Sequence, residues 1–252
     1  MYILRCIFLL LFCGLFHVAP VYAESAQVKY VIDGDTVVLS DNRHVRLLAI
    51  NTPEVEGKRR AEAGGQAAKR WLKARIEGKQ VRLVGDQQKV DGYGRSLFYL
   101  FDAQGHFINE ELLANGLAVL SIYPPNLKYL SRLQQAQQRA ESQGLGVWRL
   151  PAYQQVKLAQ LIKRKEKGWQ RVLVRPDALK AGRKYVRLIL SPEVDIRIAK
   201  KNLSYFPELK NYLFRELEVR GWASWRKGNG SILIRHPSAV IIKDSHYRPK
   251  AL

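Results

Sequence analysis

Four short polar clusters interrupt the apolar runs between residues 28 and 101, and this alternation constrains the fold more than any other feature. The apolar runs are short and rich in valine, leucine and isoleucine, which is typical of β-strands. Glycine and asparagine in the clusters favour turns between such strands. The sequence therefore predicts β-structure with polar side chains collected at strand ends. The clusters are DGDT at residues 33–36, the arginine at position 46, NTPE at residues 51–54 and DGYGR at residues 91–95.

The clusters combine carboxylates with arginines, and this combination suits chemistry on phosphate esters. Carboxylate oxygens at loop ends can hold a hard divalent cation. The planar guanidinium groups of Arg46 and Arg95 can each bind phosphate through two hydrogen bonds. A cation and two arginines together can neutralise the charge that develops on a phosphodiester attacked by water. For Arg46 a structural role is the alternative, namely an ion pair with Asp35 or Glu54.

Three strings that follow one another along the chain resemble the staphylococcal nuclease (thermonuclease-like) family: VIDGDTVVL, VRLLAINTPE and VDGYGRSLFYL. The resemblance covers about residues 28–148. It implies an OB-fold, a five-stranded Greek-key barrel, in a chain of the α+β class that is mainly β. It also implies hydrolysis of DNA and RNA with little sequence preference and a divalent cation, Ca²⁺, as cofactor. A monomer without a small-molecule cofactor is expected.

The resemblance assigns roles to individual residues of this chain. Glu54 would position or activate the attacking water, while Arg46 and Arg95 would bind the phosphate and stabilise its transition state. The other assigned residues would bind the cation or line the nucleotide pocket. They are Asp35, Asn51 and the carbonyl of Thr52 for the cation, and Tyr93 and Tyr123 for the nucleotide.

Three positions depart from the family pattern. Asn51 stands where the best-known member has an aspartate that binds the metal, so an amide oxygen replaces a charged ligand and weaker Ca²⁺ binding is expected. Gly92 stands where a lysine often approaches the nucleotide. The segment around Tyr123 is shorter than in the family, so this tyrosine matches less directly. These changes bear on the cation more than on hydrolysis, because the glutamate and both arginines assigned to catalysis are retained.

Residues 1–23 have the pattern of a secretory signal peptide. Arg5 precedes an apolar run, and a small-x-small cleavage site ends at Ala23. An uncleaved N-terminal anchor is the alternative. Both cysteines, Cys6 and Cys13, lie in this segment, so the exported protein would contain no disulfide. We therefore expect export to the periplasm or to the medium.

A second strand-rich region follows the nuclease-like one. Its first part predicts either an amphipathic helix with Val156, Ala159 and Ile162 inward or a solvated linker. Its later part shows three strands, a short helix and a hairpin, which predicts a second, OB-like β-barrel. The predicted organisation is a signal peptide at residues 1–23, a nuclease-like domain at 24–149, a basic connector at 150–168, a basic OB-like domain at 169–245 and a tail at 246–252.

Positive charge is concentrated in this second region. The 252 residues contain 42 Lys and Arg against 22 Asp and Glu, a net charge of +20. Residues 151–252 hold 23 of the basic and 8 of the acidic residues and thus carry +15. Such an excess favours a polyanionic partner, with DNA or RNA first and an anionic envelope surface as an additional partner. Trp222 and Trp225 would face opposite sides of one strand, so that one packs in the core and the other is available to bases.

The preferred interpretation is an exported metal-dependent nuclease whose second domain holds the substrate. The alternative is an inactive nucleic-acid or polyanion binder that has kept the same scaffold. The five histidines include no pair at metal-binding spacing, which excludes a typical zinc site. The chain also lacks a phosphate-loop glycine motif, which excludes a nucleotide-driven motor.

Overall fold

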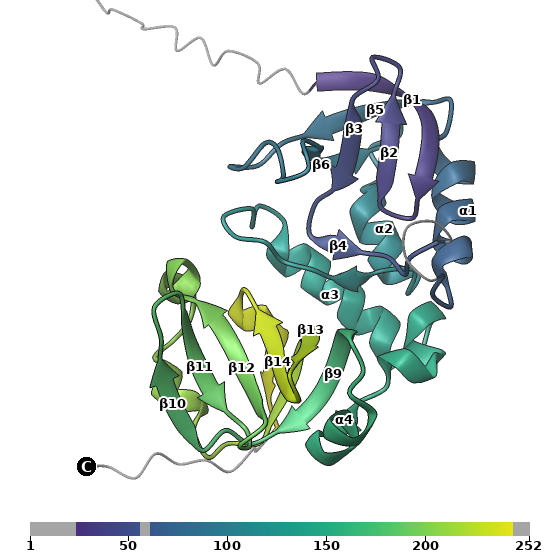
Figure 1. Cartoon of the computed structure of the whole chain (residues 1–252). Helices are drawn as coiled ribbons and strands as arrows, with labels where there is room; N and C mark the ends of the chain where they lie inside the picture. The colour runs from purple at the N-terminus through teal and green to yellow at the C-terminus, as the bar shows by residue number, and fades with distance from the viewer. Residues whose placement is uncertain (1–23, 56–60, 244–252) are drawn as a thin grey trace, which may run out of the picture.

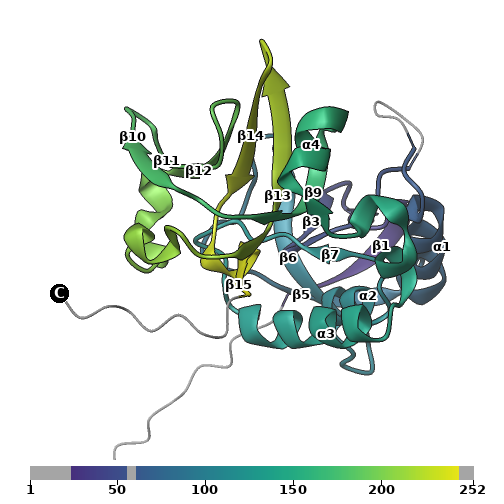
Figure 2. The same cartoon turned by 90° about the horizontal axis from the view of Figure 1, so that it is seen from below.

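The computed structural model describes residues 24–55 and 61–243, which fold into two units that lie side by side (Figure 1, Figure 2). The first unit is a small barrel with three helices, and the second is an open sheet with short helical segments. The predicted signal peptide at residues 1–23 and the predicted tail at residues 246–252 lie outside the described residues. Within the described ranges, no helix is long and apolar enough to cross a membrane.

Five strands form the closed barrel of the first unit: β1 (Glu24–Asp33), β2 (Thr36–Leu39), β3 (His44–Leu47), β5 (Gln80–Val84) and β6 (Ser96–Phe101). Their order around the barrel is β1-β2-β3-β6-β5. Only β3 and β6 run parallel, and β1 is long enough to pair with both β2 and β5. Closure turns one face of every strand inward. The predicted α+β class with a five-stranded barrel is therefore confirmed for this unit.

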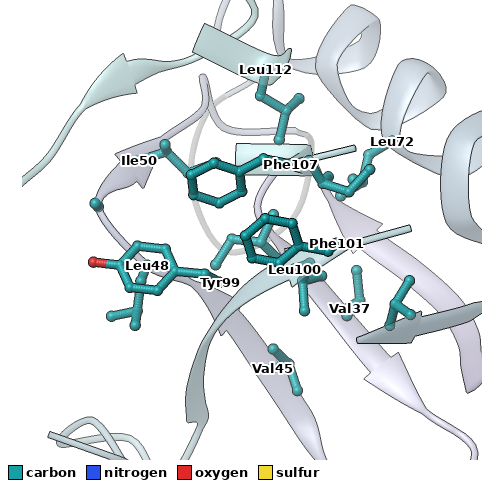
Figure 3. Close-up of a cluster of buried hydrophobic side chains, with 14 of the residues drawn as sticks. Val37, Val45, Leu48, Ile50, Leu72, Tyr99, Leu100, Phe101, Phe107 and Leu112 are labelled. Atoms are coloured by element: carbon teal, nitrogen blue, oxygen red, sulfur yellow. The ribbon is translucent and has the colours of Figure 1, made fainter. Parts of the chain in front are cut away.

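The core of the first unit fills the barrel and extends under its helices (Figure 3). The helices are α1 (Gly65–Ile76), α2 (Ile108–Ala114) and α3 (Leu130–Ser142). Each buries residues three or four positions apart, such as Ala68, Leu72 and Ile76 of α1. Phe101 of β6 stacks on Phe107 just before α2, with ring centroids 4.6 Å apart. This packing fixes the strand ends and thus the polar loops between them.

The chain leaves the barrel directly after β3. The sequence pattern predicts a strand from Val45 to Ile50, but a turn interrupts it at residues 48 and 49, where Ala49 has a left-handed φ of 64°. Beyond the turn, β4 (Ile50–Asn51) pairs with β7 (Val119–Leu120) outside the barrel. The turn therefore carries Asn51 away from β3 and towards the chain segment that precedes α3.

The second unit is an open sheet, so the predicted second barrel is wrong. The strands lie in the order β10-β11-β12-β14-β13-β9-β8, and β15 pairs with β13. β14 inserts between β12 and β13 and runs parallel to β12. The strands are β8 (Val156–Lys157), β9 (Gly168–Val174), β10 (Ala178–Ala181), β11 (Tyr185–Ile189), β12 (Val194–Ala199), β13 (Leu217–Arg226), β14 (Asn229–Ile234) and β15 (Val240–Ile242).

Short helical segments cover the apolar face of this sheet in place of a second layer of strands. They are α4 (Leu158–Arg164) and the 3₁₀ helices Lys200–Tyr205 and Leu209–Tyr212. A helix-covered open sheet and a closed barrel need the same alternation of apolar residues, so the sequence pattern did not separate them. The helical interpretation of the connector is confirmed by α4. Its buried residue is Leu161, however, and Ala159 is exposed.

The two units meet through α3 and the chain that follows it (Figure 1). Arg171 of β9 and Arg220 of β13 form ion pairs with Glu141 of α3, at 2.6 and 2.8 Å. Beside them lies an aromatic cluster whose ring centroids are 5.2 to 6.5 Å apart. Aromatic packing and half-buried ion pairs thus hold the β9 and β13 side of the sheet against the first unit. The aromatic cluster is Trp148, Tyr153 and Trp169.

Candidate active site

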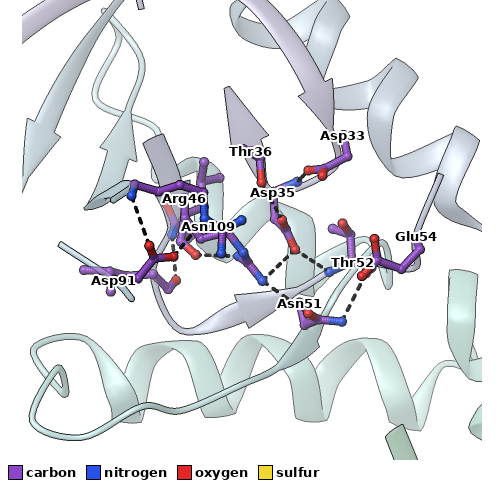
Figure 4. Close-up of polar contacts among 12 residues, drawn as sticks. Asp33, Asp35, Thr36, Arg46, Asn51, Thr52, Glu54, Asp91 and Asn109 are labelled. Carbon is purple, nitrogen blue, oxygen red and sulfur yellow. Dashed lines mark hydrogen bonds and ion pairs between the residues drawn. The ribbon is translucent and has the colours of Figure 1, made fainter. Parts of the chain in front are cut away.

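Three strand ends of the barrel bring the predicted polar side chains together (Figure 4). Asp35 lies in the tight turn between β1 and β2, and Arg46 lies in β3. Thr36 of β2 pairs with Arg46 of β3, so Asp35 lies next to this arginine. β4 and the residues after it add Asn51 and Thr52 from the other side. One cluster therefore contains the three predicted cation ligands and one predicted phosphate ligand.

The Asp35 carboxylate is the centre of this cluster. Its side chain is 7 % exposed. Oδ2 accepts the backbone N–H of Thr52 at 2.8 Å and lies 2.9 Å from Nη2 of Arg46, while Oδ1 accepts the hydroxyl of Thr36 at 3.1 Å. A buried carboxylate with this many donors is fixed in position and keeps its charge compensated.

Arg46 bridges the parts of the cluster. Besides Asp35, its Nη2 donates to Oδ1 of Asn51 at 3.2 Å, and its Nη1 donates to the carbonyl of Leu47 at 2.8 Å. The ion pair with Asp35 is one of the two structural alternatives for this arginine, and it is present. It does not exclude a role in binding phosphate, because an arginine paired with a cation ligand can exchange that partner for a phosphate when the cation binds.

Asn51 and Thr52 are joined by their own hydrogen bond. The amide nitrogen of Asn51 donates to the backbone carbonyl of Thr52 at 3.1 Å. This carbonyl is a predicted cation ligand. The amide of Asn51 therefore already donates a hydrogen bond to another predicted cation ligand. The carboxylate of an aspartate could not do so, because it has no N–H.

Asp33 places a second carboxylate beside Asp35. Its Oδ1 accepts the backbone N–H of Asp35 at 3.0 Å. Burial, together with the negative charge of Asp35, raises the pKa of Asp33 to about 6. Two carboxylates in one turn thus produce a negative potential that a cation would neutralise.

The oxygen atoms of this cluster fit a hard divalent cation such as Ca²⁺, which prefers carboxylate, carbonyl and amide oxygens. Asp35 supplies a carboxylate, Thr52 a carbonyl and Asn51 an amide oxygen. In residues 24–55 and 61–243, no group of three or more His, Cys, Asp or Glu side chains could hold a metal by itself. A cation here would therefore rely on the backbone and amide oxygens as well as on the carboxylate.

Arg95 and Tyr93 belong to a neighbouring cluster. Arg95 lies just before β6, and its Nε is 2.8 Å from Oδ2 of Asp91. Backbone N–H groups of Arg95 and Tyr93 also donate to Asp91, so this carboxylate orders the whole loop. Tyr93 is 85 % exposed, and its ring lies 5.6 Å from the guanidinium carbon of Arg95. β6 runs beside β3, so this loop lies on the strand next to the one that carries Arg46.

Glu54 and Tyr123 both follow the Asp35 cluster along the chain. Glu54 follows Thr52, and its backbone N–H donates to the Glu62 carboxylate at 3.1 Å. Tyr123 follows β7, is 48 % exposed and lies under Arg235 of the second unit, with the guanidinium carbon 4.2 Å from the ring centroid. The contact between Tyr123 and Arg235 was not predicted, because the sequence does not show where the second unit docks.

Asn109 supports the site and was misinterpreted from the sequence. The sequence pattern predicts that Asn109 caps a helix over residues 110–115, but Asn109 lies inside α2 and is fully buried. Its Oδ1 accepts the N–H of Leu100 at 2.9 Å, and its Nδ2 donates to the carbonyl of Leu48 at 2.8 Å. It thereby ties β6 to the turn that redirects the chain towards Asn51. An asparagine within an amphipathic helix, on the apolar side, was the available signal.

Comparisons with known proteins match the same part of the chain. Residues 44–150 match the family described as staphylococcal nuclease homologue. The thermonuclease of Staphylococcus intermedius is 38% identical over 132 residues, which are 51% of this chain and 78% of the relative. This chain belongs to the staphylococcal nuclease family. Members of the family generally depend on Ca²⁺.

Other relatives match a similar share of this chain. The thermonuclease of Staphylococcus hyicus is 34% identical over 129 residues, or 50% of this chain and 76% of the relative. Endonuclease YncB of Bacillus subtilis (strain 168) is 33% identical over 128 residues, or 48% of this chain and 60% of the relative. The family model ends at residue 150, so the open sheet from β8 onwards lies beyond it.

Replacing Gly34 by alanine is expected to destabilise the protein by about 1–3 kcal/mol, the usual cost of overpacking. A Cβ atom at residue 34 would lie 2.6 Å from Cβ of Ala68 and 2.7 Å from Cγ2 of Thr52. The turn that presents Asp35 would therefore have to move. Urea unfolding measures the effect, and Gly92→Ala is the control because nothing lies within 4 Å of its Cβ position. Equal stability of the two variants would contradict this close packing.

Proposed function

We propose that this member of the staphylococcal nuclease family is a metal-dependent nuclease that hydrolyses phosphodiester bonds of DNA and of RNA with little sequence preference. The observation that carries the proposal is the buried Asp35 carboxylate, 2.9 Å from the Arg46 guanidinium and 2.8 Å from the N–H of Thr52. A cation-binding oxygen and a phosphate-binding guanidinium thus belong to one fixed cluster. The thermonucleases and the endonuclease among its relatives support a phosphodiesterase.

In the proposed reaction water attacks phosphorus, the bond from phosphorus to the 5′-oxygen of the following nucleotide breaks, and no covalent bond to the protein forms. The products are a 3′-phosphate and a 5′-hydroxyl, whose proton comes from solvent water. Glu54 positions the water and accepts its proton. Arg46 and Arg95 bind the non-bridging oxygens and stabilise the charge that develops on them. Asp35, Asn51 and Thr52 would hold the cation, which when bound supplies a positive charge next to the phosphate. Tyr93, exposed beside Arg95, offers its ring to the nucleotide.

Export is part of the proposal. The pattern of residues 1–23 supports cleavage after Ala23 and release into the periplasm or the medium. Nucleic acid is the proposed partner, and the chain is proposed to act as a monomer with a nuclease domain up to about residue 149. The basic unit that follows is proposed to contact the substrate.

Hydrolysis of a labelled single-stranded DNA by the purified protein tests the proposal. Cleavage is expected with Ca²⁺, and none is expected with a chelator or in Glu54→Gln. Asn51→Asp is expected to lower the Ca²⁺ concentration for half-maximal rate about tenfold or more. One additional negative charge near the ion contributes on the order of 1–4 kcal/mol to the free energy of Ca²⁺ binding. The substitution also removes the amide N–H that donates to the Thr52 carbonyl.

Asn211→Asp is the matched control, since it adds the same charge at an exposed position of the second unit. Calorimetric titration of Ca²⁺ without DNA separates binding of the ion from catalysis. Equal Ca²⁺ affinity in the two aspartate variants would remove Asn51 from the cation site. Cleavage that continues undiminished in chelator would refute the metal-dependent reaction.

A further inference from the structure

The strand register collects one row of side chains on one face of the second sheet. Directly paired residues of neighbouring strands point to the same face. The opposite face carries core residues such as Ile196 and Ile232. We call the first face the polar face, and Arg235, which follows the end of β14, extends it. The paired residues across β10, β11, β12, β14 and β13 are, in order, Lys180, Arg187, Arg197, Leu233 and Trp222.

Part of the positive charge on the polar face is not compensated. Arg187 forms an ion pair with Asp195. Lys180, Arg197 and Arg235, in contrast, form no ion pair with a carboxylate in the described part of the chain. Nη2 of Arg197 donates to the Ser224 hydroxyl at 3.3 Å, but its buried Nε has no partner among the described residues. Cations held by the sheet without an acidic partner are available to an external anion.

The positive charge extends towards the first unit. Tyr185 of β11 pairs with Ala199 of β12, and Ile198 pairs with Ile234 of β14. This register places the β10–β11 turn at the same end of the sheet as Arg235. The turn is exposed and carries two further cations, Arg183 and Lys184. The end of the polar face nearest Arg235 is therefore strongly basic.

Arg235 connects the polar face to the candidate active site. Its guanidinium lies over the ring of Tyr123 at 4.2 Å. Tyr123 follows β7, where Leu120 pairs with Ile50, the residue before Asn51. A cavity of about 50 Å³ lies at this junction, lined by residues of both units that include Ser121, Trp222 and Arg235. A polyanion on the polar face would thus pass Tyr123 on its way to the Asp35 cluster.

Aromatic rings accompany these cations. The guanidinium carbon of Arg197 lies 5.6 Å from the centroid of the half-buried Tyr185 ring, and Trp222 lies beside Leu233 on the same face. Rings next to phosphate-binding cations suit a single strand, whose bases are free to stack on them. A duplex hides its base faces, and an anionic bilayer would use the charge without the rings.

We propose that the polar face binds a single strand of DNA or RNA and holds the part of the strand that leaves the active site beside Tyr123. The direction of the strand rests on the proposed nuclease function, whereas binding itself does not. Arg197 and Arg235 contact phosphates, while Tyr185 and Trp222 contact bases. The second unit is thereby an extension of the substrate path.

Binding of a fluorescent oligothymidylate of 20 nucleotides, measured by anisotropy in chelator at several salt concentrations, tests the proposal. The double variant Arg197→Met and Arg235→Met keeps apolar stems over Tyr185 and Tyr123 but removes both charges. We expect its affinity to fall about tenfold. Its slope of log affinity against log salt should fall by about 1.4, since each lost phosphate contact on a single strand contributes about 0.7.

The matched control is Arg164→Met with Lys210→Met, which removes two charges from segments that pack on the opposite, apolar side of the sheet. This control should leave the affinity for the oligothymidylate and its salt slope unchanged. The proposal fails if the two double variants behave alike, if a duplex of equal length binds as tightly as the single strand, or if only binding to phosphatidylglycerol vesicles is affected. Hydrolysis of a labelled single-stranded DNA by the wild-type protein is measured separately. Its absence with every metal would refute the nuclease function but not the binding face.

Discussion

Replacing Arg46 by alanine is expected to lower kcat for DNA hydrolysis about 10²–10³-fold, the usual effect of removing a fixed donor to a developing anion. The guanidinium is preorganised by the Leu47 carbonyl at 2.8 Å and by Asn51 at 3.2 Å. The same substitution removes a positive charge 2.9 Å from Asp35, so Ca²⁺ affinity should rise. Steady-state kinetics at saturating Ca²⁺ and calorimetric titration measure the two effects.

A loss of activity together with tighter Ca²⁺ binding distinguishes a phosphate ligand from a structural arginine, because damage to the fold would weaken both. Arg139→Ala is the matched control. Arg139 is 57 % exposed on α3, and its ion pair with Glu110 is long at 3.6 Å, so its loss should leave both quantities unchanged. Arg46→Lys keeps the charge but lacks the planar guanidinium group. Its kcat should therefore lie between the values of the wild type and of Arg46→Ala. Wild-type kcat in Arg46→Ala would exclude this residue from the reaction.

The members of the Asp35 cluster could be predicted because they lie in short motifs at strand ends. The motif order and the apolar strands between them are local features, and closing a five-stranded barrel brings such ends together. The hydrogen bonds within the cluster could not be predicted. They depend on the left-handed turn at Ala49, a conformation that the identity of this residue disfavours. The hydrogen bond from Asn109 to the carbonyl of Leu48 in that turn could not be predicted for the same reason.

In the second unit, local patterns predicted the elements but not their arrangement. The opposite orientation of Trp222 and Trp225 is confirmed, because alternation along a strand is local. Trp225 packs against the apolar core, whereas Trp222 lies on the polar face. The insertion of β14 between β12 and β13 is decided by pairing between distant segments. Alternation within each strand carries no information on that choice, so the sequence pattern predicts a barrel where the structure has an open sheet.

A buried carboxylate organises the contact between the two units. Glu218 of β13 is fully buried and lies 2.7 Å from Nε of Arg171, 2.6 Å from Nη2 of Arg220 and 3.0 Å from Nζ of Lys243. Arg171 and Arg220 also reach Glu141 of α3. Two arginines thus share two carboxylates at the contact with α3, and Lys243 adds a third cation beside Glu218. Removal of either carboxylate would leave an excess of buried positive charge, which is costly.

Replacing Glu218 by glutamine is expected to lower the free energy of unfolding by about 3–5 kcal/mol at pH 7, the usual cost of breaking a buried ion pair. Glutamine keeps the shape of the side chain, so the effect isolates the charge. Urea unfolding followed by tryptophan fluorescence measures it. Glu208→Gln is the control, because Glu208 is 67 % exposed and pairs only with Lys210 within the described ranges; its effect should stay within about 0.5 kcal/mol.

The pH dependence of the same variant tests the electrostatic origin of this stability. Burial acts to raise the pKa of Glu218, but Arg171, Arg220 and Lys243 outweigh it and lower the pKa from the ordinary 4.5 to about 2. Because the folded pKa is below the unfolded one, the stabilisation is complete above about pH 4.5 and is lost as the pH falls towards 2. The difference between wild type and Glu218→Gln should shrink by about 3 kcal/mol across this window. A difference that does not change with pH would show that packing, rather than charge, holds the second sheet against α3.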